Sequence, residues 1–348
     1  MTGIIIAVVF IIVIVPKIKI SKEFDENTIS LSESSSLKGI LCLAVFFNHF
    51  TGWYTDLDPI MYLFVHCGSQ VVAVFFFLSA YGIGKKYKDS TIGNEYLIKR
   101  YTSLFIPYWI CEAVYCIVSV SADIPIKVDV NPKNIFVAAL GIVDKSEIVE
   151  NAWFVTVIAL MYLIYFISYK FAPKINNTAK IWFLFILLSV LTRGRWLSTS
   201  IAFPIGTLIA EYEAKIKRIF REKSILSIIL LLLAFGLGVS LKYIGKSRNE
   251  NVVIMELSDT VTSIIFPIIV YYLIHYVKIG NSVTGFLSGI SYEVYLIHGL
   301  MIRISYRIWG PDNKIMFCLT ALGMTVIAAY VINLIYKPIK KQIFRKKI

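Results

Sequence analysis

A lysine and a histidine in one apolar segment are the residues of this sequence best placed to do chemistry. The segment at residues 37–54 reads LKGILCLAVFFNHFTGWY, with Lys38 at its start and His49 deep inside it. A spacing of eleven residues is about three helical turns, so both side chains face one side of a helix, roughly 16 Å apart along its axis. Ionisable side chains in hydrocarbon are costly and usually face a bundle interior or a wet cavity. A functional site on this face is therefore our first hypothesis.

The chemistry that His49 offers is general base catalysis. A neutral imidazole can accept the proton that an alcohol loses when it attacks an acyl carbonyl. Trp53 and Asp56 follow one and two turns later on nearly the same face, so Asp56 could orient the ring or bind a hydroxyl of an acceptor. His66, on the next segment, is predicted near the same depth, where packing is the ordinary role and acid–base chemistry the alternative. A histidine that only hydrogen-bonds a neighbouring helix explains His49 equally well.

Two other apolar segments carry polar side chains at depth. Ser291, Tyr295 and His298 share roughly one face of a helix, where they could line the same cavity or form a structural hydrogen-bond cluster. Glu112 lies about three turns inside its segment, too deep for a solvated charge. We expect its carboxyl to be neutral or paired with a cation or an imidazole. This depth makes it the leading carboxylate partner for a catalytic histidine.

Basic residues at the ends of apolar segments have two explanations. Lys38, Lys99 and Arg100 are predicted at the cytoplasmic surface, where they could bind the phosphates of a donor or simply fix the topology. Arg193 and Arg195 lie in the turn TRGRW, predicted at the outer surface. They could hold an anionic acceptor, although a short turn with solvated charges explains them as well.

The composition of the chain describes the elements that must position these residues. Of 348 residues, 57% are hydrophobic, 14% aromatic and 16% charged, which lies outside the range of soluble globular domains. Apolar runs near 20 residues recur between short polar loops, as in transmembrane helices. We therefore predict an all-α, polytopic membrane helical bundle of about eleven (10 to 12) transmembrane helices. The expected spans are residues 3–15, 37–54, 61–83, 102–121, 152–172, 179–192, 196–211, 225–243, 259–277, 286–308 and 315–336.

The net charge of +13 is best explained by membrane topology. Basic residues flank the spans instead of forming an aromatic-interleaved groove, so we expect no nucleic-acid partner. The favoured orientation has the N-terminus outside and the C-terminus in the cytoplasm. Lys242, Lys246 and Arg248 run against it, because they place three cations in one outer loop. Residues 134–143 are too short to cross and are expected to be re-entrant or interfacial.

We predict a single membrane-embedded domain, residues 1–348, in which residues 1–22 are an additional anchor helix and residues 37–336 the core. The five cysteines all lie in apolar stretches and are odd in number, as expected for small buried hydrophobes. No Cys or His spacing is typical of metal ligation. We expect no metal site and no bound cofactor.

Five stretches, in one order along the chain, carry motifs of a known family. They are residues 37–54, VVAVFFFLSAYGIG (71–84), YLIKRYTSLFIPYW (96–109), NAWF (151–154) and GISYEVYLIHG (289–299). Together they resemble the bacterial membrane acyltransferase three family. Lys38 stands where Arg is commoner and cannot make the bidentate contacts of Arg. Ala80 replaces a Gly of the family pattern, and the His that often precedes the motif's Trp is absent.

The resemblance implies a membrane-bound O-acyltransferase. It would transfer an acetyl or other acyl group from cytoplasmic acyl-CoA to a hydroxyl of an extracytoplasmic polysaccharide, such as exopolysaccharide, or of another cell-envelope glycan or lipid-linked sugar. His49 would then be the general base, and Lys38 would hold the donor or shape its entrance. The face of Ser291, Tyr295 and His298 would help position the carbonyl. The candidates for binding the acceptor are Trp53, Asp56, His66, Ser291, Arg193 and Arg195.

Two other functions fit the same residues. In a proton-coupled transporter or flippase of lipid-linked sugars, His49 and Glu112 would carry protons. In a non-catalytic assembly subunit, His49 would be dispensable for acylation. The sequence leaves open the acceptor, the acyl chain, the oligomeric state, and whether transfer is direct or passes through an acyl-enzyme.

Overall fold

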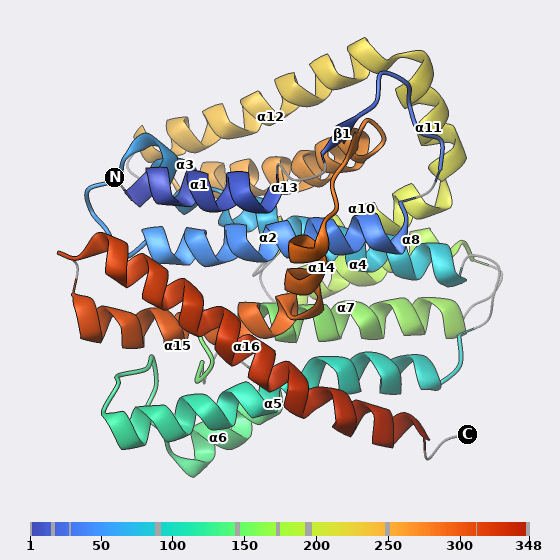
Figure 1. The fold of residues 1–348 in the computed structure, drawn as a ribbon. Coiled ribbons are helices and arrows are strands. Elements are labelled where there is room, and N and C mark those ends of the chain that lie inside the picture. The colour runs from blue at the N-terminus through green and yellow to red at the C-terminus, as the bar shows by residue number, and fades with distance from the viewer. Residues whose placement is uncertain are drawn as a thin grey trace.

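A computed structural model of the chain describes residues 2–14, 18–27, 29–87, 92–142, 147–171, 175–191, 197–247, 251–310 and 312–345. Helices make up most of these residues and run side by side as a bundle (Figure 1). Two short strands, β1 (Lys19–Ile20) and β2 (Val277–Lys278), pair antiparallel. The predicted all-α membrane bundle is confirmed.

Each predicted span coincides with one helix or with a pair of helices. The single helices are α1 (Thr2–Ile14), α2 (Leu31–Thr51), α5 (Glu95–Ala122), α7 (Trp153–Lys170), α8 (Asn177–Leu191), α12 (Ser224–Ser247), α13 (Val252–Ile274) and α16 (Lys314–Arg345). The pairs are α3 (Pro59–His66) with α4 (Gly68–Tyr87), α9 (Leu197–Ser200) with α10 (Ala202–Glu211), and α14 (Ser282–Gly289) with α15 (Ser291–Trp309). The short helices α6 (Pro132–Ala139) and α11 (Glu213–Glu222) complete the set for the described residues.

Length and composition identify a subset of these helices as clear membrane spans. Among the described residues, α5, α7, α12, α13 and α16 meet both criteria, which makes 5. Counting the bent pairs α3–α4, with an angle of 47°, and α14–α15, with 75°, brings the number to 7. Helix α2 falls short because it begins in the polar residues LSESSS and carries Asn48 and His49. The figure of about eleven crossings stays a prediction.

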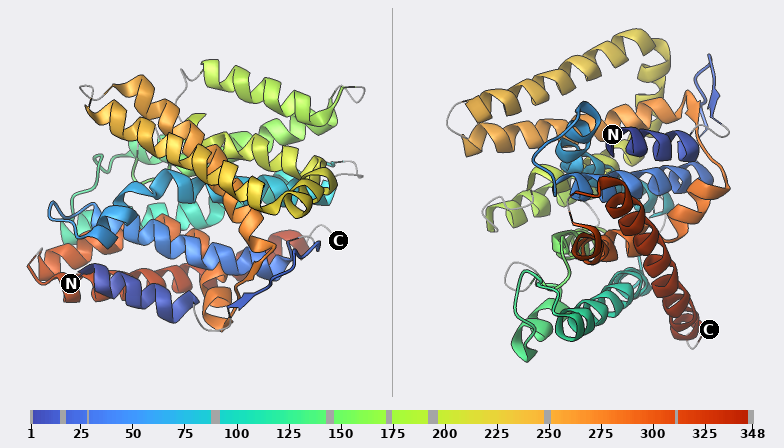
Figure 2. Two further views of the ribbon diagram at one scale, coloured as in Figure 1. Left: turned by 90° about the horizontal axis from the view of Figure 1, so that it is seen from above. Right: turned by 60° about the vertical axis from the view of Figure 1, so that its left-hand side comes forward.

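Helix α2 lies in the middle of the bundle and packs against α1, α3, α4, α14 and α15. It begins in a capping box, in which the Ser30 side chain accepts from the Glu33 N–H and the Glu33 side chain from the Ser30 N–H. Gly39 permits α14 to come close, because a Cβ at this position would lie 2.2 Å from the carbonyl oxygen of Thr284. In Figure 2, α12 and α13 lie on one side of α2 and α16 on the other.

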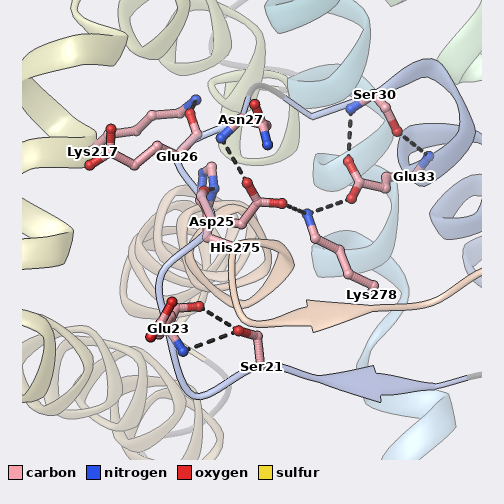
Figure 3. A network of polar contacts seen from close by, with 10 residues as sticks. All are labelled: Ser21, Glu23, Asp25, Glu26, Asn27, Ser30, Glu33, Lys217, His275 and Lys278. Carbon is pink, nitrogen blue, oxygen red and sulfur yellow. Dashed lines mark hydrogen bonds and ion pairs between the residues drawn. The ribbon is translucent and has the colours of Figure 1, made fainter.

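The segment that leads into α2 is fixed by a polar network at the end of α13 (Figure 3). Lys278 of β2 lies 2.7 Å from Asp25 and 2.5 Å from Glu33. The ring of His275 stacks on Phe24, with centroids 4.5 Å apart, and its Nδ1 lies 2.7 Å from the carbonyl oxygen of Asp25. These contacts, together with the β1–β2 pairing, hold the start of α2 against the end of α13.

Candidate active site

Two histidines from distant parts of the chain meet inside the bundle. The rings of His49 on α2 and His298 on α15 have centroids 4.9 Å apart. His298 is fully buried and His49 partly buried. The Nδ1 of His298 lies 3.1 Å from the carbonyl oxygen of Val294, and since a carbonyl only accepts, Nδ1 carries the proton. The Nε2 of His298 is then an acceptor, and it has no hydrogen-bond partner among the described residues.

Tyr295 lies one turn before His298 and forms the wall next to it. The two rings are 6.0 Å apart, and Phe154 at the start of α7 packs 5.3 Å from the Tyr295 ring. The Tyr295 hydroxyl donates to the carbonyl oxygen of Asn151 at 2.7 Å. This bond fixes α15 against the beginning of α7, so Tyr295 positions the site while its proton is already engaged.

A cavity of about 230 Å³ leads from Tyr295 to the two cations Lys38 and Arg100. We call it the basic cavity. Its lining residues are Lys38, Val72, Phe75, Ser79, Arg100, Ser103, Leu104, Phe154, Ile158, Tyr162, Ser291, Tyr292 and Tyr295. No carboxylate is among these residues, so the cavity favours an anionic ligand with an apolar portion. The Arg100 guanidinium lies 5.2 Å from the Tyr162 ring centroid and 5.7 Å from that of Tyr96, a cation–π arrangement that fixes its direction.

The structure separates the predicted donor-binding residues. Lys38 and Arg100 both line the basic cavity, whereas Lys99 is exposed and is not part of its lining. Consecutive residues of a helix point about 100° apart, so Arg100 can line the cavity while Lys99 remains outside its lining. Ser291, predicted to bind the acceptor, lines the basic cavity beside Lys38, and its Oγ donates to the carbonyl oxygen of Ser288 at 3.0 Å.

An ion pair that the sequence did not single out lies next to Gly299 on α15. Glu150 pairs with Arg303 on α15. The Arg303 guanidinium lies 5.8 Å from the Trp53 ring centroid, and Trp53 packs 4.7 Å from Tyr306. A Cβ at Gly299, the residue after His298, would come 2.7 Å from Glu150 Oε2. The one sequence signal for Glu150 was its position immediately before the NAWF motif.

Other predicted site residues lie away from the two rings. The Asp56 side chain is 96% exposed and 3.9 Å from Lys314, so it is not a hydrogen-bond partner that orients His49. His66 packs against Tyr62 at 4.5 Å and lines a different cavity. Arg193 and Arg195 lie outside the described residues.

Glu112 was expected to be either neutral or paired, and no pairing is found in the part of the chain that the structure describes. Glu112 is only 4% exposed, which agrees with its predicted depth. Its Oε1 has no hydrogen-bond partner among the described residues, and no described cation or imidazole pairs with it. The carboxylate that lies closest to Gly299, the residue after His298, is that of Glu150.

No three His, Cys, Asp or Glu side chains of the described residues come together in a way that could hold a metal ion.

Comparison with known protein families identifies the family to which the chain belongs. The sequence model of the acyltransferase three family, described as an acyltransferase domain, matches residues 33–334. The chain belongs to this family. The match runs from the first turn of α2 into α16, so the acyltransferase domain contains both histidines and the basic cavity, while α1 precedes it. No curated protein and no solved structure matched this acyltransferase significantly.

Proposed function

We propose that this multi-pass membrane acyltransferase transfers an acetyl or other short acyl group from cytoplasmic acyl-CoA to a hydroxyl of an extracytoplasmic polysaccharide or other cell-envelope glycan. The observation that carries the proposal is the basic cavity, which begins at Lys38 and Arg100 and ends at Tyr295, one turn from the His49–His298 pair. A donor in this cavity and an acceptor beyond the histidines would meet at the two imidazoles.

The donor's chemistry matches the cavity at both ends. Acyl-CoA carries phosphates, which Lys and Arg bind through charge-assisted hydrogen bonds, and a thin arm that ends in the thioester. The cavity volume of about 230 Å³ is below the roughly 300–1,000 Å³ of pockets that enclose a whole drug-sized ligand. It therefore suits the acyl-bearing arm, with the nucleotide outside near Lys38 and Arg100. Ser291 would contact the donor in this arrangement, because it lines the same cavity.

The transfer step needs a base and a way to return the proton. His49 accepts the proton of the acceptor hydroxyl while that oxygen attacks the thioester carbon. The C–O bond forms, the C–S bond breaks, and the CoA sulfur leaves with the proton that His49 returns. His298, with its ring 4.9 Å from that of His49, offers a second imidazole to hold His49 in place. Tyr295 and its bond to Asn151 keep this wall rigid.

The acceptor's side is supported by the cluster of Trp53, Tyr306, Arg303 and Glu150. Aromatic faces and a few well-placed charged groups are the usual lining of sites for small polar ligands. Trp53 and Tyr306 can pack against the apolar face of a sugar ring, and the ion pair can bind its hydroxyls. This cluster takes the place of Asp56 and His66 in the proposal.

The decisive experiment measures turnover of the thioester. Purified protein, acetyl-CoA and a bacterial surface glycan should release free CoA thiol, and His49→Ala should abolish the release while elution and thermal midpoint stay unchanged. Proton-driven movement of a sugar without CoA release would support a transporter instead. If cells carrying His49→Ala kept the acetyl content of their glycans, as measured by mass spectrometry, the protein would be a non-catalytic subunit.

Neighbouring residues on α5 supply a matched pair for testing the donor site. Arg100→Gln should raise the KM for acyl-CoA about tenfold, because one charge-assisted contact to a phosphate is worth roughly 1.5 kcal/mol. Lys99→Gln removes the same charge from an exposed position outside the cavity lining and should leave the KM unchanged. Equal effects of the two substitutions would place the donor elsewhere.

A further inference from the structure

A second cavity, of about 550 Å³, lies between α12 and the helices α2, α3 and α4. We call it the α12 groove. Its walls are mainly apolar and include Leu63, Val71, Phe235, Val239 and Phe266. It shares no lining residue with the basic cavity, and the reaction proposed above makes no use of it.

The groove exists because α12 packs on α13 and α13 in turn packs on α4. Glycines bring the two outer helices together: a Cβ at Gly238 would lie 2.7 Å from Thr262 Cγ2. The Ser258 hydroxyl donates across this contact to the carbonyl oxygen of Gly238 at 2.7 Å. Helix α12 is thereby held one helix away from the body of the bundle, as Figures 1 and 2 show. Apolar side chains of α12 that face the gap stay open, and Val239 is 50% exposed.

One end of the groove is positively charged. Lys242 and Lys246 are four residues apart on α12, hence on one face, and both line the groove. Lys242 lies 3.0 Å from Asp259, whereas Lys246 is exposed and has no ion pair among the described residues. Among the described residues, one positive charge therefore remains uncompensated at this end. These lysines are also the cations that run against the preferred topology, so a role beyond topology is needed to explain them.

We propose that the α12 groove binds one anionic phospholipid of the surrounding bilayer. The phosphate of the lipid lies at Lys246 and Lys242, and one acyl chain runs along Phe235 and Phe266, whose rings are 5.9 Å apart. Phe235 is seven residues from Lys242, which is roughly 10 Å along a helix. A lipid whose phosphate lies at Lys242 therefore has its acyl chain at the level of Phe235. A zwitterionic lipid has no net charge to offset the free lysine, and the site selects against it.

A tryptophan reporter in the groove tests this proposal. In nanodiscs with chain-brominated lipids, the fluorescence of Phe235→Trp should be quenched several-fold more by phosphatidylglycerol than by phosphatidylcholine at equal content. Leu233→Trp is the matched control, because residue 233 is on the same helix and 66% exposed. Its quenching should not depend on the headgroup. The signal of the native tryptophans is subtracted with the unsubstituted protein.

Adding Lys246→Gln to the reporter should remove the headgroup preference without changing the CoA release of the enzyme. Val239→Trp serves as a second reporter if Phe235→Trp does not elute as a single species. Equal quenching by the two lipids at both reporters would overturn the proposal, and so would a preference that survives Lys246→Gln. Stronger competition by a polyprenyl-phosphate sugar than by phosphatidylglycerol would also overturn it, because the groove would then belong to the acceptor.

Discussion

The closest approach between α2 and α14 makes Gly39→Ala a sharp test of the structure. A Cβ at Gly39 would lie 2.2 Å from the carbonyl oxygen of Thr284 and 3.1 Å from the backbone nitrogen of Ser288. Both neighbours are backbone atoms of α14, so no side chain can rotate away. The two helices would have to move apart by about 1 Å to reach ordinary contact distance.

The expected loss follows from a comparison with a second glycine, which lies on α14 outside this contact. Overpacking by added carbon atoms typically costs about 1–3 kcal/mol. Alanine in place of glycine inside a helix gains about 1 kcal/mol. Gly285, on α14, would have no atom within 4 Å of an added Cβ, so Gly285→Ala shows the helix gain alone. The free energy of unfolding of Gly39→Ala should therefore be lower than that of Gly285→Ala by roughly 1–3 kcal/mol.

Thermal unfolding in detergent, followed by the loss of the monodisperse elution peak, measures this difference. For chains of 150–250 residues, 1 kcal/mol shifts the midpoint by about 2–4 °C, so a separation of a few degrees is expected here. Because Lys38 precedes Gly39, the displacement of α2 should also raise the KM for acyl-CoA more than it lowers kcat. A Gly39→Ala protein as stable as Gly285→Ala would show that α2 and α14 do not meet as described, and the position of Lys38 in the cavity would lose its support.

Two further predictions concern charged groups outside the basic cavity. The hydrogen bond from Lys278 lowers the pKa of the Asp25 carboxyl from 3.8 to about 2. A carboxyl whose pKa is lower in the folded than in the unfolded protein stabilises the folded state at a pH above the unfolded-state pKa. This contribution is lost as the pH falls through the folded-state pKa. Lys278→Met should therefore lower the thermal midpoint at pH 7, and the difference from the unsubstituted protein should shrink between about pH 4 and pH 2. A difference in midpoint that does not change with pH would show that Lys278 does not lower the pKa of Asp25. Replacing Arg303 by Met leaves Glu150 without its cation. Because the Glu150 side chain is 10% exposed, the free energy of unfolding should fall by less than the roughly 3–5 kcal/mol that breaking a fully buried pair costs. The double variant with Glu150→Gln should recover part of this loss in a thermal double-mutant cycle, and strictly additive effects would show that the two side chains do not interact.

Much of the fold could be predicted from local sequence. Apolar runs near 20 residues become helices because a helix satisfies its backbone polar groups within one segment, as the bilayer requires. The predicted segments accordingly coincide with helices or bent pairs, and residues 134–143 overlap the eight-residue helix α6. The 75° bend between α14 and α15 was missed, because no proline marks it and the apolar pattern continues across it.

The site was only partly predictable. His49 stood out because an imidazole in an apolar segment is costly, and Lys38 because it shares that face. Glu112 was singled out by the same argument, yet its Oε1 has no hydrogen-bond partner among the described residues. The ring next to that of His49 belongs to His298. Depth in the membrane is a local property of the sequence, but it does not determine which helix a side chain faces.

The sequence by itself determined that the protein is a helical membrane acyltransferase and that His49 and Lys38 lie on one face of one helix. Tertiary structure decided the partners: His298 rather than Glu112 beside His49, Arg100 rather than Lys99 in the cavity. Hydropathy is set residue by residue, whereas the rotation and spacing of helices depend on contacts such as that of Gly39 with Thr284, between residues far apart in the chain. Which residues meet in such contacts therefore cannot be predicted from the sequence of either helix alone.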